Sequence, residues 1–191
     1  MKKFFTIAAI MASSFIFAQD KDNNNDKKNN KITTISARGM YSEPSQLGLS
    51  FEFEGLKWGY KNTQIVNISY GIMNYDVGLF DVEGQGFAIE IGGRKYYNKG
   101  TKLEGLYTGN YLSYGNIKFD ENLMFGKFDG TYSYFSFFSP EVGFKMKFGD
   151  FSIDPFIGIM WKIEVKGKGD IDNKYVDEWT PRAGLKIGYT F

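Results

Sequence analysis

Residues 179–191 alternate between two kinds of side chain, and this pattern limits the folds open to the chain more than any other feature. Every second residue is apolar, and the residues between are polar or glycine; the apolar set is Trp179, Pro181, Ala183, Leu185, Ile187, Tyr189 and Phe191. A period of two places successive side chains on opposite faces of a β-strand. The sequence therefore predicts a strand with one apolar and one polar face.

The same alternation recurs along most of the chain. It is clear in residues 47–54, 66–72, 87–94, 141–148 and 151–165, and weaker in residues 31–41 and 105–119, which gives eight strands with the last one. An even number of antiparallel strands places both ends of an up-and-down barrel on the same side of the membrane. Eight strands are a common size for small membrane barrels. We therefore predict an all-β fold, an eight-stranded antiparallel up-and-down transmembrane β-barrel.

Beyond the N-terminal region, the sequence contains no segment that would form a membrane-spanning helix. The longest run without Asp, Glu, Lys or Arg is Asn62–Tyr75, and it carries several amides and a serine. About 20 apolar residues would be needed for such a helix. The 19 Phe, 13 Tyr and 23 Gly of the chain instead favour strands joined by tight turns.

The expected connections between strands alternate in length, which suits a membrane barrel. Those at 59–62, 98–102 and 149–150 are short, whereas three of the four at 42–45, 76–84, 120–130 and 167–177 are long. Short turns face the periplasm in such barrels, and long loops face outside. With this polarity two aromatic girdles are expected, with Trp161 and Trp179 at the outer interface and Trp58, Tyr96, Tyr97, Tyr189 and Phe191 at the periplasmic one.

A soluble β-sandwich or a lipocalin-like barrel would also alternate, so it is the competing fold. In that fold the polar face would meet water and the apolar face would form the core. The charges on the polar face are diluted by many Gly, Ser and Asn residues. Because this composition suits a narrow lumen better than a soluble surface, the membrane barrel is the preferred interpretation.

The N-terminus has the composition of a secretion signal followed by a polar spacer. Lys2 and Lys3 precede the uncharged stretch Phe4–Phe17, so residues 1–18 are predicted to be a signal peptide cleaved after Ala18. The alternative is an uncleaved anchor, but the stretch is too short to span a membrane comfortably. Residues 19–30 contain no apolar side chain and are predicted to be a disordered linker, which leaves residues 31–191 for the barrel.

Composition excludes several kinds of chemistry and partner. The chain has no His and no Cys, which removes His-dependent general-base catalysis, thiol chemistry and His or Cys metal ligands. Lys and Arg together number 23, against 22 Asp and Glu, so no charge excess favours a nucleic-acid partner. We therefore predict no enzyme activity, no cofactor and no metal.

Three local patterns resemble functional motifs, and a structural interpretation is preferred for each. The carboxylates of Glu52 and Glu54 share one strand face, which is expected to be the lumen. The glycine-rich segments 83–87 and 166–170 match no nucleotide-binding spacing and are interpreted as loops. The third pattern is an acidic cluster formed by Asp170, Asp172, Asp177 and Glu178. It either holds Ca²⁺ or forms a solvated loop, and the loop is preferred.

The charged residues of the polar strand faces are predicted to form a network in the lumen. If Gly149 and Asp150 form a two-residue hairpin turn, Lys145 lies opposite Asp154 on the inward face. Acidic and basic groups in this set balance, and an eight-stranded barrel is just wide enough for them to fill it. The network consists of Glu52, Glu54, Glu90, Arg94, Glu141, Lys145, Lys147, Asp154, Lys162, Glu164, Arg182 and Lys186.

The terminal segment AGLKIGYTF, together with GFAIEIGGRKYYNKG and GLYTGNYLSYG, resembles the small gram-negative outer-membrane β-barrel domain family of OmpA/OmpX-type architecture. The resemblance implies a location in the cell outer membrane, in contact with lipid and lipopolysaccharide. It also implies that barrel-assembly machinery reads a C-terminal signal at Tyr189 and Phe191. Enzymes of similar architecture depend on a histidine, which this chain lacks.

Two functions remain open. The first is a monomeric structural or surface-interaction scaffold with a plugged polar lumen, whose loops at 120–130 and 167–177 contact an unknown extracellular partner. Leu123, Met124, Phe125 and Phe128 are apolar for an exposed loop, which favours such a contact. The second is a narrow channel or small-ligand conduit across the outer membrane.

Overall fold

The computed structural model describes residues 33–54, 62–76, 81–98, 103–123, 126–170 and 176–191. The predicted signal peptide, the predicted linker and Trp58 lie outside these residues. The strands of the described part are β1 Thr33–Tyr41, β2 Ser45–Glu54, β3 Asn62–Asp76, β4 Asp81–Tyr96, β5 Gly105–Leu123, β6 Gly126–Phe138, β7 Pro140–Phe148, β8 Phe151–Gly169 and β9 Trp179–Thr190. Among the described residues, no helix has the length and apolar character needed to cross a membrane.

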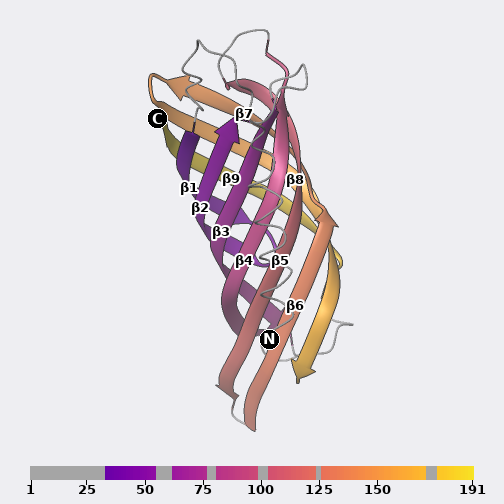
Figure 1. Cartoon of the computed structure of the whole chain (residues 1–191). Helices are drawn as coiled ribbons and strands as arrows, with labels where there is room; N and C mark the ends of the chain where they lie inside the picture. The colour runs from indigo at the N-terminus through magenta and orange to yellow at the C-terminus, as the bar shows by residue number, and fades with distance from the viewer. Residues whose placement is uncertain (1–32, 55–61, 77–80, 99–102, 124–125, 171–175) are drawn as a thin grey trace, which may run out of the picture. The chain divides into compact units, whose positions relative to one another are not determined.

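The strands form one closed antiparallel sheet (Figure 1). From β1 to β5 each strand pairs with the next, β8 pairs with β9, and β1 pairs with β9 to close the ring. Segments β6 and β7 both pair with β5 on one side and β8 on the other, so they share one place in the wall. The nine described segments therefore fill eight positions, and the predicted eight-stranded antiparallel barrel is confirmed.

The sixth wall position is broken at Ser139, and the Asn110 side chain bridges the break. Asn110 Nδ2 donates to the carbonyl oxygen of Phe137 at 3.4 Å, and its Oδ1 accepts from the backbone N–H of Ser139 at 2.8 Å. Unpaired backbone groups facing lipid are costly because no water is present to satisfy them. A lipid-facing amide at this position therefore completes the hydrogen bonding of an irregular strand.

The strand β6 was not predicted from the sequence, because its inward residues include Tyr132 and Tyr134 and a bulge interrupts its alternation near Phe137. Its pairing with β8 shifts register between Ser133 and Tyr134 and again between Phe135 and Phe138. The first shift leaves an extra residue, Val165, in β8, and the second leaves one in β6, where Phe137 and Phe138 are both exposed. A bulge adds one residue on one side of a ladder, so the two-residue period is lost there.

Three segments that were predicted to be loops lie largely in strands. Residues 83–87 belong to β4, and β8 continues as far as Gly169. Residues 120–130 form the end of the β5–β6 hairpin, in which Asp120 pairs with Asp129 and Leu123 with Gly126. Figure 1 shows β5 and β6 extending beyond the other strands at one end of the barrel. Polar residues occupy the outward face of this extension, so hydrophobic alternation did not reveal it.

Apolar side chains cover the outside of the barrel. The exposed set includes Leu47, Leu49, Ile68, Tyr70, Phe87, Leu112, Phe144, Ile157, Leu185 and Ile187, drawn from strands around the ring. Soluble proteins rarely expose contiguous apolar surface on this scale. An exterior of this kind, combined with a closed sheet, is suited to contact with lipid.

Aromatic pairs mark the two edges of this apolar belt on β8 and β9. Phe151 lies opposite Tyr189, with ring centroids 5.2 Å apart, and Trp161 stacks on Trp179 at 6.0 Å. About ten residues of β8 separate the two pairs, which at roughly 3.3 Å per residue and a tilt of about 40° gives a height of about 25 Å. This height matches the apolar band of an outer-membrane barrel. Phe191 packs against Tyr189 at 5.0 Å.

Candidate functional site in the barrel lumen

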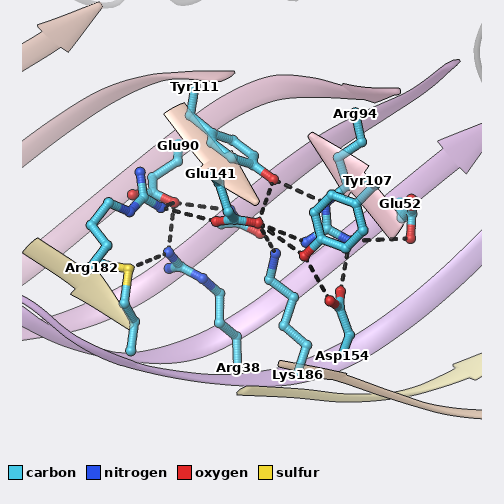
Figure 2. A network of polar contacts seen from close by, with 12 residues as sticks. Arg38, Glu52, Glu90, Arg94, Tyr107, Tyr111, Glu141, Asp154, Arg182 and Lys186 are labelled. Carbon is cyan, nitrogen blue, oxygen red and sulfur yellow. Dashed lines mark hydrogen bonds and ion pairs between the residues drawn. The ribbon is translucent and has the colours of Figure 1, made fainter. Parts of the chain in front are cut away.

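Nine charged side chains meet inside the barrel, and each of these residues is at most 4% exposed. They come from β1, β2, β4, β7, β8 and β9, so the network joins opposite walls (Figure 2). The inward positions of alternating strands place them there. The members are Arg38, Glu52, Glu90, Arg94, Glu141, Lys145, Asp154, Arg182 and Lys186, which we call the lumen network.

Arg94 is the centre of one half of the lumen network. Its guanidinium lies 2.7 Å from Asp154, 3.0 Å from Glu141 and 3.9 Å from Glu52. It also lies 3.9 Å from the centre of the Tyr107 ring, and its Nε donates to the Tyr111 hydroxyl at 3.0 Å. One cation therefore pairs with three carboxylates from three different strands.

Glu90 is the centre of the other half. Its Oε2 lies 2.7 Å from Arg38 and 3.1 Å from Arg182, and it accepts a hydrogen bond from Asn67 Nδ2 at 2.9 Å. Glu141 connects the two halves, because it lies 3.6 Å from Arg182 as well as 3.0 Å from Arg94. The charges therefore form one continuous system rather than separate pairs.

Lys145 and Asp154 each pair with a residue other than the predicted cross-strand partner. The β7–β8 register follows the predicted hairpin, since Phe148 lies opposite Phe151 and Met146 opposite Ile153. Lys145, however, reaches Glu52 at 2.7 Å, and Asp154 reaches Arg94 at the same distance. Long inward side chains meet across a narrow lumen, so contacts between distant strands replace those between neighbours.

Two of the other predicted network members, Lys162 and Glu54, lie apart from this centre. Lys162 is buried but pairs with Glu43, at 3.7 Å, instead of with the network. Glu54 is exposed because it is the last residue of β2, at the rim of the barrel. Lys147 and Glu164 are half-buried.

Arg38 was not predicted to lie in the lumen, and Tyr96 was predicted in the wrong environment. Arg38 is fully buried on β1, whose outward residues include Ala37 and Gly39, and such small residues give a weak alternation. Tyr96 is 3% exposed and faces inward, where its hydroxyl donates to Glu52 at 2.7 Å. It therefore does not belong to the periplasmic girdle, whereas the neighbouring Tyr97 is exposed.

Apolar and aromatic side chains fill the lumen on the side of the long hairpin. A buried cluster there consists of Met73, Tyr75, Val82, Ile117, Phe119, Phe128, Tyr132, Tyr134, Met160 and Val176. Phe128, which was expected in an exposed loop, is a member of this cluster and is only 6% exposed. Its ring lies 5.8 Å from that of Tyr75 and 6.3 Å from that of Phe119.

Aromatic rings inside the barrel lie on glycines of neighbouring strands. A Cβ atom added at Gly115 would lie 2.2 Å from the Tyr134 ring, and one added at Gly143 would lie 2.2 Å from the Tyr107 hydroxyl. Only a residue without a side chain leaves room for a ring at this distance. The high glycine content therefore allows bulky residues to fill a narrow interior.

The arrangement defines the fold of an outer-membrane β-barrel protein: a closed antiparallel sheet, apolar outside and polar at its centre. The predicted alternation of strand faces thus corresponds to lipid and lumen. Within the described part of the chain, no three Asp or Glu residues are arranged to hold a metal ion.

Comparisons with known proteins agree with this fold. The sequence matches no protein-family model, and it has no significant match among curated proteins. A major outer membrane protein from Thermus thermophilus is similar in structure, with a TM-score of 0.52 and 14% identity over 84% of this chain and 99% of that chain. Ail, the attachment invasion locus protein of Yersinia pestis, has a TM-score of 0.50 and 16% identity over 84% of this chain and 97% of Ail. At these identities the likeness concerns the fold alone.

Proposed function

We propose that this protein is a monomeric structural or surface-interaction scaffold of the cell outer membrane, with a lumen that does not conduct. The observation that carries the proposal is the lumen network, in which charges from opposite walls are buried and paired. An eight-stranded barrel has an interior just wide enough for side chains. An ion crossing it would have to separate several of these pairs.

The apolar cluster at the other end of the lumen supports the same function. Phe119, Phe128 and Tyr132 occupy the interior beyond the charged centre, where a conducting path would need polar lining. Removing a hydrated ion from water into apolar surroundings is strongly unfavourable. An ion would therefore have to pass both the lumen network and the apolar cluster to cross the barrel.

The β5–β6 hairpin is the part of the scaffold that we assign to an extracellular partner. It extends past the aromatic edge of the belt and carries exposed charges, including the ion pair of Lys127 with Asp120 at 2.9 Å. Asp129 and Asp170 lie beside them and share backbone and side-chain hydrogen bonds. Rigid strands present these groups with little loss of conformational entropy on binding.

The remaining surfaces suit the membrane and its assembly machinery. The apolar belt faces lipid and, in the outer leaflet, lipopolysaccharide. Tyr189 and Phe191 end the outward face of the last strand, and Phe191 is 72% exposed beside the periplasmic aromatic pair. We assign to these two residues the signal that the barrel-assembly machinery reads.

Conductance across a planar bilayer tests the scaffold proposal. The purified barrel should give no steady current, whereas a 16-stranded porin in the same bilayer serves as the positive control. A steady current that is weakened, or made selective for one ion, by Lys145→Met or Asp154→Asn would contradict the proposal. That result would identify the protein as a narrow channel.

A further inference from the structure

The outward face of β5, β6 and β8 changes in chemistry towards the extracellular end of the barrel. The strand register places the outward residues of these strands in rows, and successive rows lie two residues, about 7 Å, further along the strands. One row is apolar and consists of Tyr114, Phe135 and Ile163. In the next row Asn116 Nδ2 donates to the Ser133 hydroxyl at 2.7 Å. The surface therefore turns from apolar to polar at this point.

Two lysines, which we call the lysine row, occupy the following row. Thr131 pairs with Lys118 on one side and with Lys168 on the other, so the lysines lie two strand spacings, about 10 Å, apart. Both are exposed, and neither forms an ion pair with any residue that the structure describes. Their flexible side chains reach far enough to hold one anion between them.

Three aspartates, which we call the aspartate row, lie two residues beyond the lysine row: Asp120, Asp129 and Asp170. Asp120 lies directly opposite Asp129, and like charges in that position destabilise a ladder. Lys127 pairs with Asp120 at 2.9 Å and also attracts Asp129, but Asp129 and Asp170 form no ion pair within the described part of the chain. The aspartate row therefore has fewer cationic partners than carboxylates.

The lysine and aspartate rows are close together but do not neutralise each other. Asp120 follows Lys118, and Asp170 follows Lys168, each by two residues, yet neither of these pairs forms an ion pair. A ligand with only a negative charge would be attracted by the lysines and repelled by the aspartates. A ligand that carries both charges, with the negative one nearer the membrane, is complementary to both rows.

We propose that the lysine and aspartate rows bind the phosphoethanolamine headgroup of a membrane lipid, with its phosphate at the lysines and its ammonium at the aspartates. In such a lipid the acyl chains, glycerol esters, phosphate and ammonium follow one another outward from the membrane. The four rows present complementary groups in the same order. The proposal rests on the surface-interaction role of the β5–β6 hairpin and names lipid as the partner of its base.

Lipid binding to the purified barrel tests the proposal. The lipid-free barrel in an uncharged detergent is mixed with equal amounts of phosphatidylethanolamine, phosphatidylglycerol and phosphatidylcholine with the same acyl chains, and bound lipid is counted by native mass spectrometry. Phosphatidylethanolamine should be bound about fivefold more often than either other lipid. The reason is that phosphatidylglycerol lacks an ammonium group, and the methylated ammonium of phosphatidylcholine has no N–H to donate. Soluble glycerophosphoethanolamine should not displace the lipid, because it lacks the acyl chains that lie on the apolar row.

Substitutions in the two rows should have different effects. Lys118→Met combined with Lys168→Met should reduce the binding of all three lipids, since each has a phosphate. Asp129→Asn combined with Asp170→Asn should instead abolish the preference for phosphatidylethanolamine, while phosphatidylglycerol still binds. Asp81→Asn, at an exposed position outside the rows, is the matched control and should change neither the amount nor the preference. All these positions are exposed, so the variants should fold, and in lipid-free detergent Lys118→Met alone should leave the stability of the barrel nearly unchanged.

Equal binding of the three lipids would overturn the proposal, and so would a preference for phosphatidylethanolamine that survives the loss of both aspartates. Unchanged lipid binding after the loss of both lysines would contradict the position of the phosphate. Displacement by the soluble headgroup would show that the ligand is not a lipid. These outcomes are independent of the conductance measurement, because a lipid on the outward face does not alter the path through the lumen.

Discussion

Replacing Arg94 with methionine should destabilise the folded barrel by about 3–5 kcal/mol, the range for removing one partner from a buried ion pair. Methionine keeps an unbranched apolar stem and removes the guanidinium, together with its charge and its hydrogen bond to Tyr111. Three carboxylates would lose one cationic partner, since Arg94 lies within 4 Å of Asp154, Glu141 and Glu52. Of these, Glu52 would keep Lys145 at 2.7 Å, and Glu141 would keep Lys186 at 3.4 Å and Arg182 at 3.6 Å.

The measurement is the fraction of folded barrel on unboiled SDS gels across a denaturant series. A closed barrel has no free strand edge and satisfies its backbone internally, so folded and unfolded forms migrate differently. Lys118→Met is the matched control, because Lys118 lies exposed on the outward face of β5 and should change stability by less than about 0.5 kcal/mol. Equal midpoints for the two variants would show that the lumen network does not stabilise the barrel.

The faces of the strands were predictable from sequence because each face meets a different environment. Along β9, inward residues such as Lys186 are polar because they face the lumen, and outward residues such as Ile187 are apolar because they face lipid. Where the outward face of a strand carries exposed polar residues, as at the end of the β5–β6 hairpin, the alternation of apolar-outward and polar-inward residues is lost. Asp120 and Asp129 therefore suggested a loop, although they are paired in a strand ladder.

The partners inside the lumen were not predictable from strand positions alone. A hairpin register places Lys145 opposite Asp154, but the closed barrel also brings Glu52 within 2.7 Å of Lys145. That contact depends on the curvature of the wall and on side-chain length, which a sequence pattern does not contain. Bulges have the same effect on β6, because a single inserted residue changes which side chains point inward.

Glycines on the inward strand faces show what the strand register reveals beyond the amino-acid composition. The sequence shows many glycines, but only the pairing of β5 with β6 places Gly115 opposite Tyr134. The Tyr134 ring also stacks on Tyr132, with centroids 5.9 Å apart, and is fully buried in the apolar cluster. It therefore has little freedom to move away from the neighbouring strand.

Replacing Gly115 with alanine should accordingly destabilise the barrel by about 1–3 kcal/mol, the usual cost of overpacking a filled interior. The added Cβ would lie 2.2 Å from a carbon of the Tyr134 ring, well inside normal contact distance. Gly39→Ala is the matched control, because a Cβ at Gly39 meets nothing within 4 Å and should leave stability nearly unchanged. Denaturant midpoints of the two variants give the comparison.

A double-mutant cycle assigns the Gly115 effect to the ring itself. Once Tyr134→Ala has removed the ring, the Gly115→Ala change should cost almost nothing, so the two changes should be coupled by about 1–3 kcal/mol. Additive effects of the two substitutions would instead place the cost in the backbone of β5, where alanine would be disfavoured with or without the ring. The cycle thus separates packing of a ring on glycine from an intrinsic requirement for glycine in the strand.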